Sequence, residues 1–188
     1  MTSPPGKSGK GVHVSERENP PVTEAADPPL AELFQVSHVI PELKSSTREG
    51  VIAEIVERVA ARELVRDAKW LETALAERER MVPTAMPNGV AFLHARHRAA
   101  EKFPNQFLFL ARSSKGVSFG SPDEKPTHLF FLLALRKDMA HLRWLARLSW
   151  ICRNRTTVGS LLKASTAEEI AKALRVAVDE LPGNLKQK

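Results

Sequence analysis

The 188-residue sequence has one cysteine, no tyrosine and an aromatic content of only 6%. A single cysteine excludes an internal disulfide framework, so nothing in the sequence requires an oxidising compartment. The longest apolar run, Leu129 to Leu135, has seven residues, whereas roughly 20 are needed to cross a bilayer. Because the N-terminus also lacks an apolar core, we expect neither a secretory signal nor a membrane span. The remaining expectation is a soluble, cytoplasmic protein.

Hydrophobic residues make up 43% of the chain and charged residues 27%, which is typical of a globular protein with one domain of ordinary size. The formal net charge is +6, although the first 30 residues carry three basic and four acidic side chains. The basic excess therefore belongs to the rest of the chain. It is compatible with nucleic acid, phosphate groups or an acidic protein surface as partner, and also with an ordinary solvated surface.

The first 30 residues contain six of the 13 prolines and no aromatic residue. Such a segment cannot bury enough apolar surface to offset the entropy of ordering it. We therefore predict a disordered, proline-rich tail over residues 1–30 and a folded domain over residues 31–181. A short C-terminal tail is expected over residues 182–188, since Pro182 and Gly183 stop the last helix.

Hydrophobic periodicity predicts helices and strands that follow one another along this domain. Capping boxes that begin at Ser46 and Ser165 each precede a helical pattern. The helices are expected over residues 47–62, 67–80, 138–152, 157–162 and 166–181. Short apolar runs predict strands over residues 39–43, 90–93, 107–110 and 128–135, the last buried on both faces because it does not alternate. This order predicts an α/β sandwich around a small sheet.

Two histidines are candidates for chemistry. His94 follows the apolar run 90–93, so its imidazole is expected at the end of a strand, where α/β folds place ligand crevices. His141 lies in the first turn of the helix expected from Asp138, where free N–H groups attract anions. A helical projection places His141 at the edge of a buried face made by Leu142, Leu145, Ala146 and Ser149. The alternative is that both are partly exposed polar residues without a functional role.

A metal site and a catalytic thiol are the other candidates. Zinc would need His94 and His97 with His128 or His141 as a third ligand. No carboxylate or cysteine accompanies these histidines at a recognised spacing, so we expect no metal and no cofactor. Cys152 ends an amphipathic helix, which is typical of an inert core residue.

The stretch from Arg78 to Arg96 resembles the signature of the type-2 (fructose/mannitol/nitrogen-type) enzyme IIA domain of the bacterial phosphotransferase system (PTS). It reads Arg-Glu-Arg-Met-Val-Pro-Thr-Ala-Met-Pro-Asn-Gly-Val-Ala-Phe-Leu-His-Ala-Arg. The family's pattern is an Arg-Glu pair, a threonine and then Gly-Ile-Ala-x-Pro-His-(Ala/Gly)-Arg. Residues 116–123 are similar to the family's hairpin, and His141 lies where the family has a second histidine. The resemblance covers residues 31–181 and implies a small mixed sheet flanked by helices in a three-layer sandwich.

The resemblance implies that His94 accepts a phosphoryl group from phospho-HPr and passes it to an enzyme IIB domain. A neutral imidazole is a competent nucleophile near neutral pH, and phosphoryl transfer depends mainly on positioning and charge neutralisation. By the same resemblance, Arg78 supplies fixed positive charge, and His141 orients His94 or donates a hydrogen bond to the phosphoryl oxygens. The hydroxyl of Thr84 is expected to hold the imidazole or the phosphate.

Three residues depart from the family's pattern. Leu93 replaces the proline that usually precedes the active histidine, Phe92 replaces a smaller aliphatic residue, and Pro87 stands where glycine is common. Proline before the histidine would fix φ near about −65°, so its absence predicts a less preorganised His94 and less efficient transfer. Since Arg78, Thr84, His94 and His141 are all present, we still expect a working phosphocarrier.

The chain has no room for a fused IIB domain or permease, so its partners are expected in trans. An alternative within the family is a nitrogen-type regulatory protein, which controls partner proteins by binding according to its phosphorylation state. A third hypothesis is a basic nucleic-acid-binding module built on Arg143, Arg147, Arg153 and Arg155. The low aromatic content and the lack of a recognition motif argue against it, so we expect no nucleic acid and no direct membrane insertion.

Overall fold

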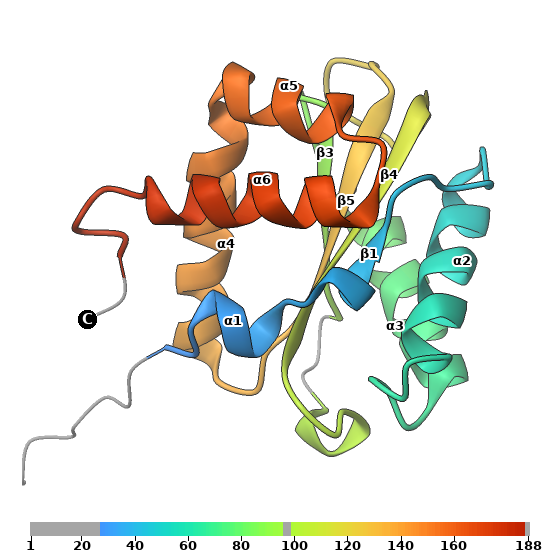
Figure 1. Ribbon diagram of the computed structural model, residues 1–188. Helices are drawn as coiled ribbons and strands as arrows, with labels where there is room; N and C mark the ends of the chain where they lie inside the picture. The colour runs from blue at the N-terminus through green and yellow to red at the C-terminus, as the bar shows by residue number, and fades with distance from the viewer. Residues whose placement is uncertain (1–26, 96–98, 187–188) are drawn as a thin grey trace, which may run out of the picture.

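The computed structural model describes residues 27–95 and 99–186. Within this part of the chain, five strands form one mixed sheet in the order β1-β4-β5-β3-β2. Figure 1 shows α2 and α3 on one side of the sheet and α4 to α6 on the other. The predicted three-layer α/β sandwich around a small mixed sheet is therefore confirmed.

The centre of the sheet is the antiparallel pair of its two longest strands, β4 and β5. β3 runs parallel to β5, and β1 runs parallel to β4. The edge strand β2 is antiparallel to β3. β4 is longer than predicted because its second half is polar and has an irregular register, so the apolar run ends before the strand does. The strands are β1 (Val39–Ile40), β2 (Ala85–Met86), β3 (Val90–Leu93), β4 (Phe107–Val117) and β5 (Thr127–Ala134).

The helices begin close to the predicted residues. Thr47 caps α2 by accepting a hydrogen bond from the backbone N–H of Gly50, and Thr166 forms a capping box with Glu169 at the start of α6. Both caps lie one residue after the predicted serines, because the threonine side chains reach the helix N–H groups. The helices are α1 (Leu30–Leu33), α2 (Arg48–Ala60), α3 (Ala68–Met81), α4 (Asp138–Arg153), α5 (Arg155–Lys163) and α6 (Ala167–Asp179), with 3-10 turns at Val36–His38 and Ala100–Lys102.

The sheet divides the core into two halves because successive strand residues point to opposite faces. In β3, Val90 and Phe92 pack with α4, α5 and α6. Ala91 and Leu93 pack with α2 and α3. β5 is buried on both faces, as its unbroken apolar run predicted. No helix in the described ranges has the length and apolar character needed to span a membrane.

Both ends of the described chain pack on α4. Asp27 is buried and forms ion pairs with Arg147 and Arg143. The carbonyl of Leu185 accepts a hydrogen bond from Nε of Arg147. Residues 27–30 and 182–186 therefore contact the domain, although we predicted them to be tail segments. The rest of the predicted N-terminal tail lies outside the described residues.

Candidate active site

The imidazole of His94 is held by contacts at both of its nitrogens. His94 follows the last residue of β3, and its Nδ1 lies 2.8 Å from the carbonyl oxygen of Phe92. A carbonyl only accepts hydrogen bonds, so Nδ1 carries the proton. On the other side, Nε of Arg78 donates to Nε2 of His94 at 3.3 Å. The two contacts together assign the lone pair to Nε2, which is the nucleophilic nitrogen in this tautomer.

Arg78 reaches His94 from the last turn of α3. Its Nη1 donates to the carbonyl oxygen of Val82 at 2.5 Å, so the guanidinium is anchored to the chain that leaves the helix. This anchor holds a permanent positive charge beside Nε2 of His94. These two residues, sixteen positions apart in the sequence, are thus in direct contact in the structure.

His141 approaches from the opposite helical layer. Its ring centroid lies 5.2 Å from that of His94, with an angle of 64° between the ring planes. His141 is only 5% exposed, whereas Leu142 is 56% exposed. The predicted buried face of α4 is therefore wrong. Apolar residues lie on more than one side of this helix, and the face that packs on the sheet is Ala140, His141, Trp144, Leu148, Ile151 and Cys152.

Thr84 lies beside the end of β3, and its carbonyl accepts a hydrogen bond from the backbone N–H of Phe92 at 3.4 Å. Its hydroxyl donates to one carboxylate oxygen of Glu79, and its backbone N–H donates to the other at 2.9 Å. The structure therefore brings His94, Arg78 and His141 together, and it engages the hydroxyl of Thr84 with Glu79.

Glu79 is a residue of this region to which the sequence reasoning gave no role. It is 1% exposed, and burial raises the pKa of its carboxyl, against the opposing effects of the Thr84 hydrogen bonds and the charges of Arg78 and Arg48. The carboxyl fixes the loop that joins α3 to β2. Glu79 follows Leu71 and Leu75 at four-residue spacing on the buried face of α3. An acidic residue in such an apolar stripe indicates a buried carboxyl with a specific partner.

The other chemical candidates lie away from His94. His128 is at the start of β5, where its Nδ1 donates to the carbonyl oxygen of Ser113 at 3.0 Å. Burial raises the pKa of the Cys152 thiol to about 12, so this thiol is neutral. Across residues 27–95 and 99–186, no three His, Cys, Asp or Glu side chains are placed to hold a metal ion. His97, part of the zinc hypothesis, lies outside these ranges.

The four arginines of the nucleic-acid hypothesis do not form one surface. Arg147 is 5% exposed and pairs with Asp27, so it is part of the interior. Arg143 contacts the same carboxylate. Arg153 and Arg155 lie more than one helical turn further along, at the corner between α4 and α5. The charge cluster seen in the sequence is thus divided between a buried ion pair and a separate corner.

Comparison with known proteins shows which family the chain matches. The family model described as "Phosphoenolpyruvate-dependent sugar phosphotransferase system, EIIA 2" matches residues 32–176. A nitrogen regulatory protein of Bradyrhizobium diazoefficiens is 28% identical over 149 residues, which are 78% of this chain and 94% of that protein. The PTS fructose-specific EIIABC component of Bacillus subtilis is 27% identical over 143 residues, 75% of this chain. The chain spans only 22% of that longer relative.

Solved structures share the fold. Nitrogen regulatory protein IIA-Ntr from Neisseria meningitidis superposes with a TM-score of 0.67 at 24% identity, covering 76% of this chain and 97% of that one. The enzyme IIA-mannitol chain in a complex with phosphorylated enzyme IIB-mannitol from Escherichia coli gives a TM-score of 0.66 at 17% identity, covering 76% and 97%.

Proposed function

Because this chain belongs to the EIIA type-2 family of the phosphoenolpyruvate-dependent sugar phosphotransferase system, we propose that it is a cytoplasmic phosphocarrier. It accepts a phosphoryl group from phospho-HPr on Nε2 of His94 and passes the group to an enzyme IIB partner. The observation that carries this proposal is the tautomer of His94, whose Nδ1–H is bound to the Phe92 carbonyl and whose Nε2 lone pair faces Arg78.

The transfer step needs no proton at the reacting nitrogen. The Nε2 lone pair of His94 attacks phosphorus while the nitrogen–phosphorus bond of the donor breaks, and the donor imidazole leaves with the bonding electron pair. The proton stays on Nδ1 throughout, hydrogen-bonded to the Phe92 carbonyl oxygen. Transfer to the acceptor reverses these roles, with Nε2 of His94 as leaving group. The ring is thus held in one tautomer in both directions.

Arg78 and His141 neutralise and position the phosphoryl group. The charge on the equatorial oxygens is the main electrostatic demand of phosphoryl transfer, and Arg78 already lies 3.3 Å from the reacting nitrogen. When Nε2 forms its bond to phosphorus, the Arg78 guanidinium donates to the phosphoryl oxygens instead. His141 limits the movement of the His94 ring from the other side. Thr84 acts through Glu79, as a positioning residue for the loop before β2.

The surface around the histidines fits proteins as donor and acceptor. Met81 and Val82 follow Arg78 and are 56% and 62% exposed, while Met139 and Leu142 flank His141 and are 51% and 56% exposed. Large exposed apolar side chains grouped around a site are typical of a protein-binding surface. These four residues form the apolar rim on which we expect HPr and the IIB partner to dock in turn.

A nitrogen-type regulatory role is the second candidate. It is favoured by the match to nearly the full length of the Bradyrhizobium nitrogen regulatory protein. In that role the phosphate on His94 is a signal, and the partner is a regulated protein instead of a IIB domain. The geometry of His94, Arg78 and His141 serves both roles equally, so the acceptor decides between them.

A phosphorylation assay tests the proposal. The protein is incubated with enzyme I, HPr and radiolabelled phosphoenolpyruvate, beside the variants His94→Ala, Arg78→Gln and, as matched control, His13→Ala. We expect acid-labile label on the wild type and the control, none on His94→Ala, and a rate about 10²- to 10³-fold lower for Arg78→Gln, the usual loss when one charge-stabilising donor is removed. Label on His94→Ala, or no label on either the wild type or the control, would overturn the carrier proposal.

A second step then identifies the acceptor. The labelled protein is mixed with a purified fructose-type IIB domain. Rapid movement of label to IIB supports the carrier role, whereas label that stays on His94 supports the regulatory role.

A further inference from the structure

A cavity lies at the opposite end of the sheet from His94. It has a volume of about 550 Å³ and is lined by residues from four segments, 87–89, 125–128, 152–155 and 158–162. We call it the corner pocket, because it opens between the start of β3 and the corner where α4 meets α5. The length of β3 separates it from His94, roughly 13 Å for a strand of four residues.

The corner pocket has a one-sided charge. Lys125 lines it from one segment and Arg153 and Arg155 from another, and none of its lining residues is an aspartate or glutamate. Arg153 and Arg155 are exposed, and no carboxylate of the described chain pairs with either of them. Lys125 has a weak, exposed contact with Asp123 at 3.5 Å. The protein therefore leaves a concentrated positive charge that an anion neutralises.

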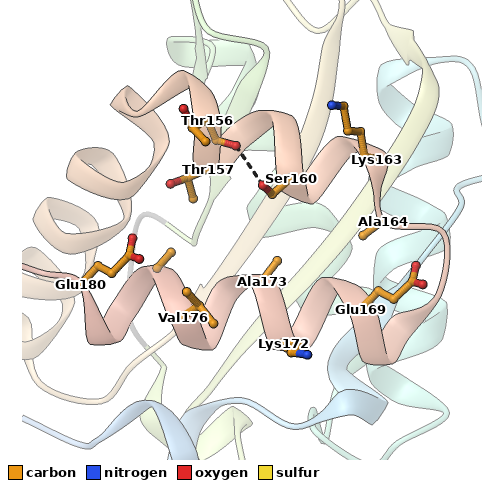
Figure 2. A pocket seen from close by; sticks show the side chains of 11 residues that line it. Thr156, Thr157, Ser160, Lys163, Ala164, Glu169, Lys172, Ala173, Val176 and Glu180 are labelled. Carbon is orange, nitrogen blue, oxygen red and sulfur yellow. Dashed lines mark hydrogen bonds between the residues drawn. The ribbon is translucent and has the colours of Figure 1, made fainter.

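A neighbouring cavity has a different charge pattern. The groove between α5 and α6, about 590 Å³, is drawn in Figure 2. Two lysines line it, Lys163 and Lys172, but so do Glu169 and Glu180. Because both signs are present there, its electrostatics favour neither an anion nor a cation. Of these two cavities, only the corner pocket selects for negative charge.

The walls of the corner pocket are apolar below this cationic rim. Pro126, Val158 and Leu162 contribute aliphatic surface. The space beside Gly159 is open, because a Cβ built on this residue would have no neighbouring atom within 4 Å. The N-terminus of α5 is already capped by the side chain of Asn154, which accepts hydrogen bonds from the backbone N–H groups of Thr156 and Thr157. An anion is therefore expected to contact the basic side chains, while the apolar part of the same ligand lies along α5.

We propose that the corner pocket binds an organic phosphate of mononucleotide size. Its phosphate groups contact Arg153, Arg155 and Lys125, and its apolar or planar body covers the wall that Val158 and Leu162 form. A volume of about 550 Å³ is within the usual range for sites that hold small molecules and cofactors. The site is independent of phosphoryl transfer at His94 and uses none of its residues.

Titration calorimetry on the full chain tests this site with AMP, ATP and inorganic phosphate as probes. We expect AMP and ATP to bind more tightly than inorganic phosphate, since only they reach the apolar wall. The double variant Arg153→Gln/Arg155→Gln should weaken nucleotide binding by about 10- to 100-fold, as expected for lost charge-assisted hydrogen bonds. The control Arg175→Gln removes one exposed charge from α6 and should leave the affinity unchanged.

A steric variant tests the same site without changing its charge. Gly159→Leu places a side chain in the open space of the pocket and also favours the helix, so it should fold normally and lose nucleotide binding. The proposal is overturned if no probe binds at millimolar concentration, if the arginine and leucine variants bind as the wild type does, or if inorganic phosphate binds as well as AMP. Loss of binding in His94→Ala would place the nucleotide at the histidines instead. The arginine variants should still accept phosphate from HPr, so failure of the corner pocket leaves the carrier proposal intact.

Discussion

Replacing Asp27 by alanine removes the carboxylate that faces Arg147 in the interior of the domain. Its Oδ2 lies 2.8 Å from Nη2 of Arg147, and the two side chains are 4% and 5% exposed. A second partner, Arg143, lies 3.3 Å from Oδ1 and is 34% exposed. In the variant, the Arg147 guanidinium keeps the carbonyl of Leu185 and the ring of Trp144, 5.1 Å away, but it has no countercharge.

A buried charge that loses its only close partner typically costs about 3–5 kcal/mol. Nearly all of this cost is assigned to Arg147, because Arg143 is solvated and contributes little. Urea unfolding followed by tryptophan fluorescence measures the effect. With a slope of about 2 kcal/mol per molar urea, the midpoint of Asp27→Ala should fall by about 1.5–2.5 M.

A double-mutant cycle separates the charge from the packing. Arg147→Met replaces the buried cation with an apolar side chain, so that removing Asp27 in this background leaves no unpaired buried charge. We expect Asp27→Ala to change the midpoint by less than about 0.5 M in the Arg147→Met protein. An equal loss in both backgrounds would refute the reasoning, because the cost would then come from the packing of the N-terminal segment and not from the ion pair.

Three further predictions concern single residues. Burial raises the pKa of Glu79 above its ordinary 4.5, so the stabilising contribution of this carboxyl is full below pH 4.5 and is lost as the pH rises through the raised pKa. The unfolding free energy of the wild type relative to Glu79→Gln should therefore fall over that pH range, and a constant difference would contradict this. Gly116→Ala should cost about 2 kcal/mol or more in urea unfolding, since φ is +74° and the new Cβ would lie 2.7 Å from Cε1 of His128, whereas Gly159→Ala, in open space, should cost nothing. Cys152 is 1% exposed with a thiol pKa of about 12, so a thiol reagent at pH 8 should label it only as fast as the protein opens; labelling within seconds in the native state would be inconsistent with that burial.

The sequence predicted the architecture well where one physical signal dominated. The apolar runs of β3 and β5 are buried on both faces, and such runs identify interior strands without further information. α2 and α3 each have a single apolar stripe and one clear cap, Thr47 or Asp67. In these elements the local pattern and the tertiary packing require the same conformation.

The predictions failed where burial depends on a distant partner. α4 has apolar residues on several sides, so periodicity alone chose Leu142 as a buried residue, and the structure exposes it. Arg147 is buried only because Asp27, 120 positions away in the sequence, neutralises it. An aspartate in a proline-rich segment gives no local signal of that role. The second half of β4 was missed for a related reason, since its polar residues are held by a ladder with β5 and not by their own burial.

The site shows the same division between local and distant information. The motif around His94 pointed to Arg78, and the wider resemblance pointed to His141. The topology explains why both lie at His94: α3 and α4 cover opposite faces of the sheet, and each brings one of these residues to the end of β3. The nitrogen of His94 that carries the lone pair could not be assigned from the motif. That assignment needs the Phe92 carbonyl and the Arg78 guanidinium, because only their hydrogen bonds fix the tautomer of the ring.

Leu93 shows how the residue before the histidine can have a structural role other than that of proline. It is fully buried, pairs in register with Leu132 of β5, and packs with α2 and α3. A proline at this position would fix φ but would have no N–H for a ladder and a smaller apolar side chain for the core. Leu93 therefore continues β3 up to His94, and the strand sets the direction in which the imidazole leaves the sheet. Together with the hydrogen bonds at both ring nitrogens of His94, this anchoring supplies a physical route to preorganisation that does not depend on a pyrrolidine ring.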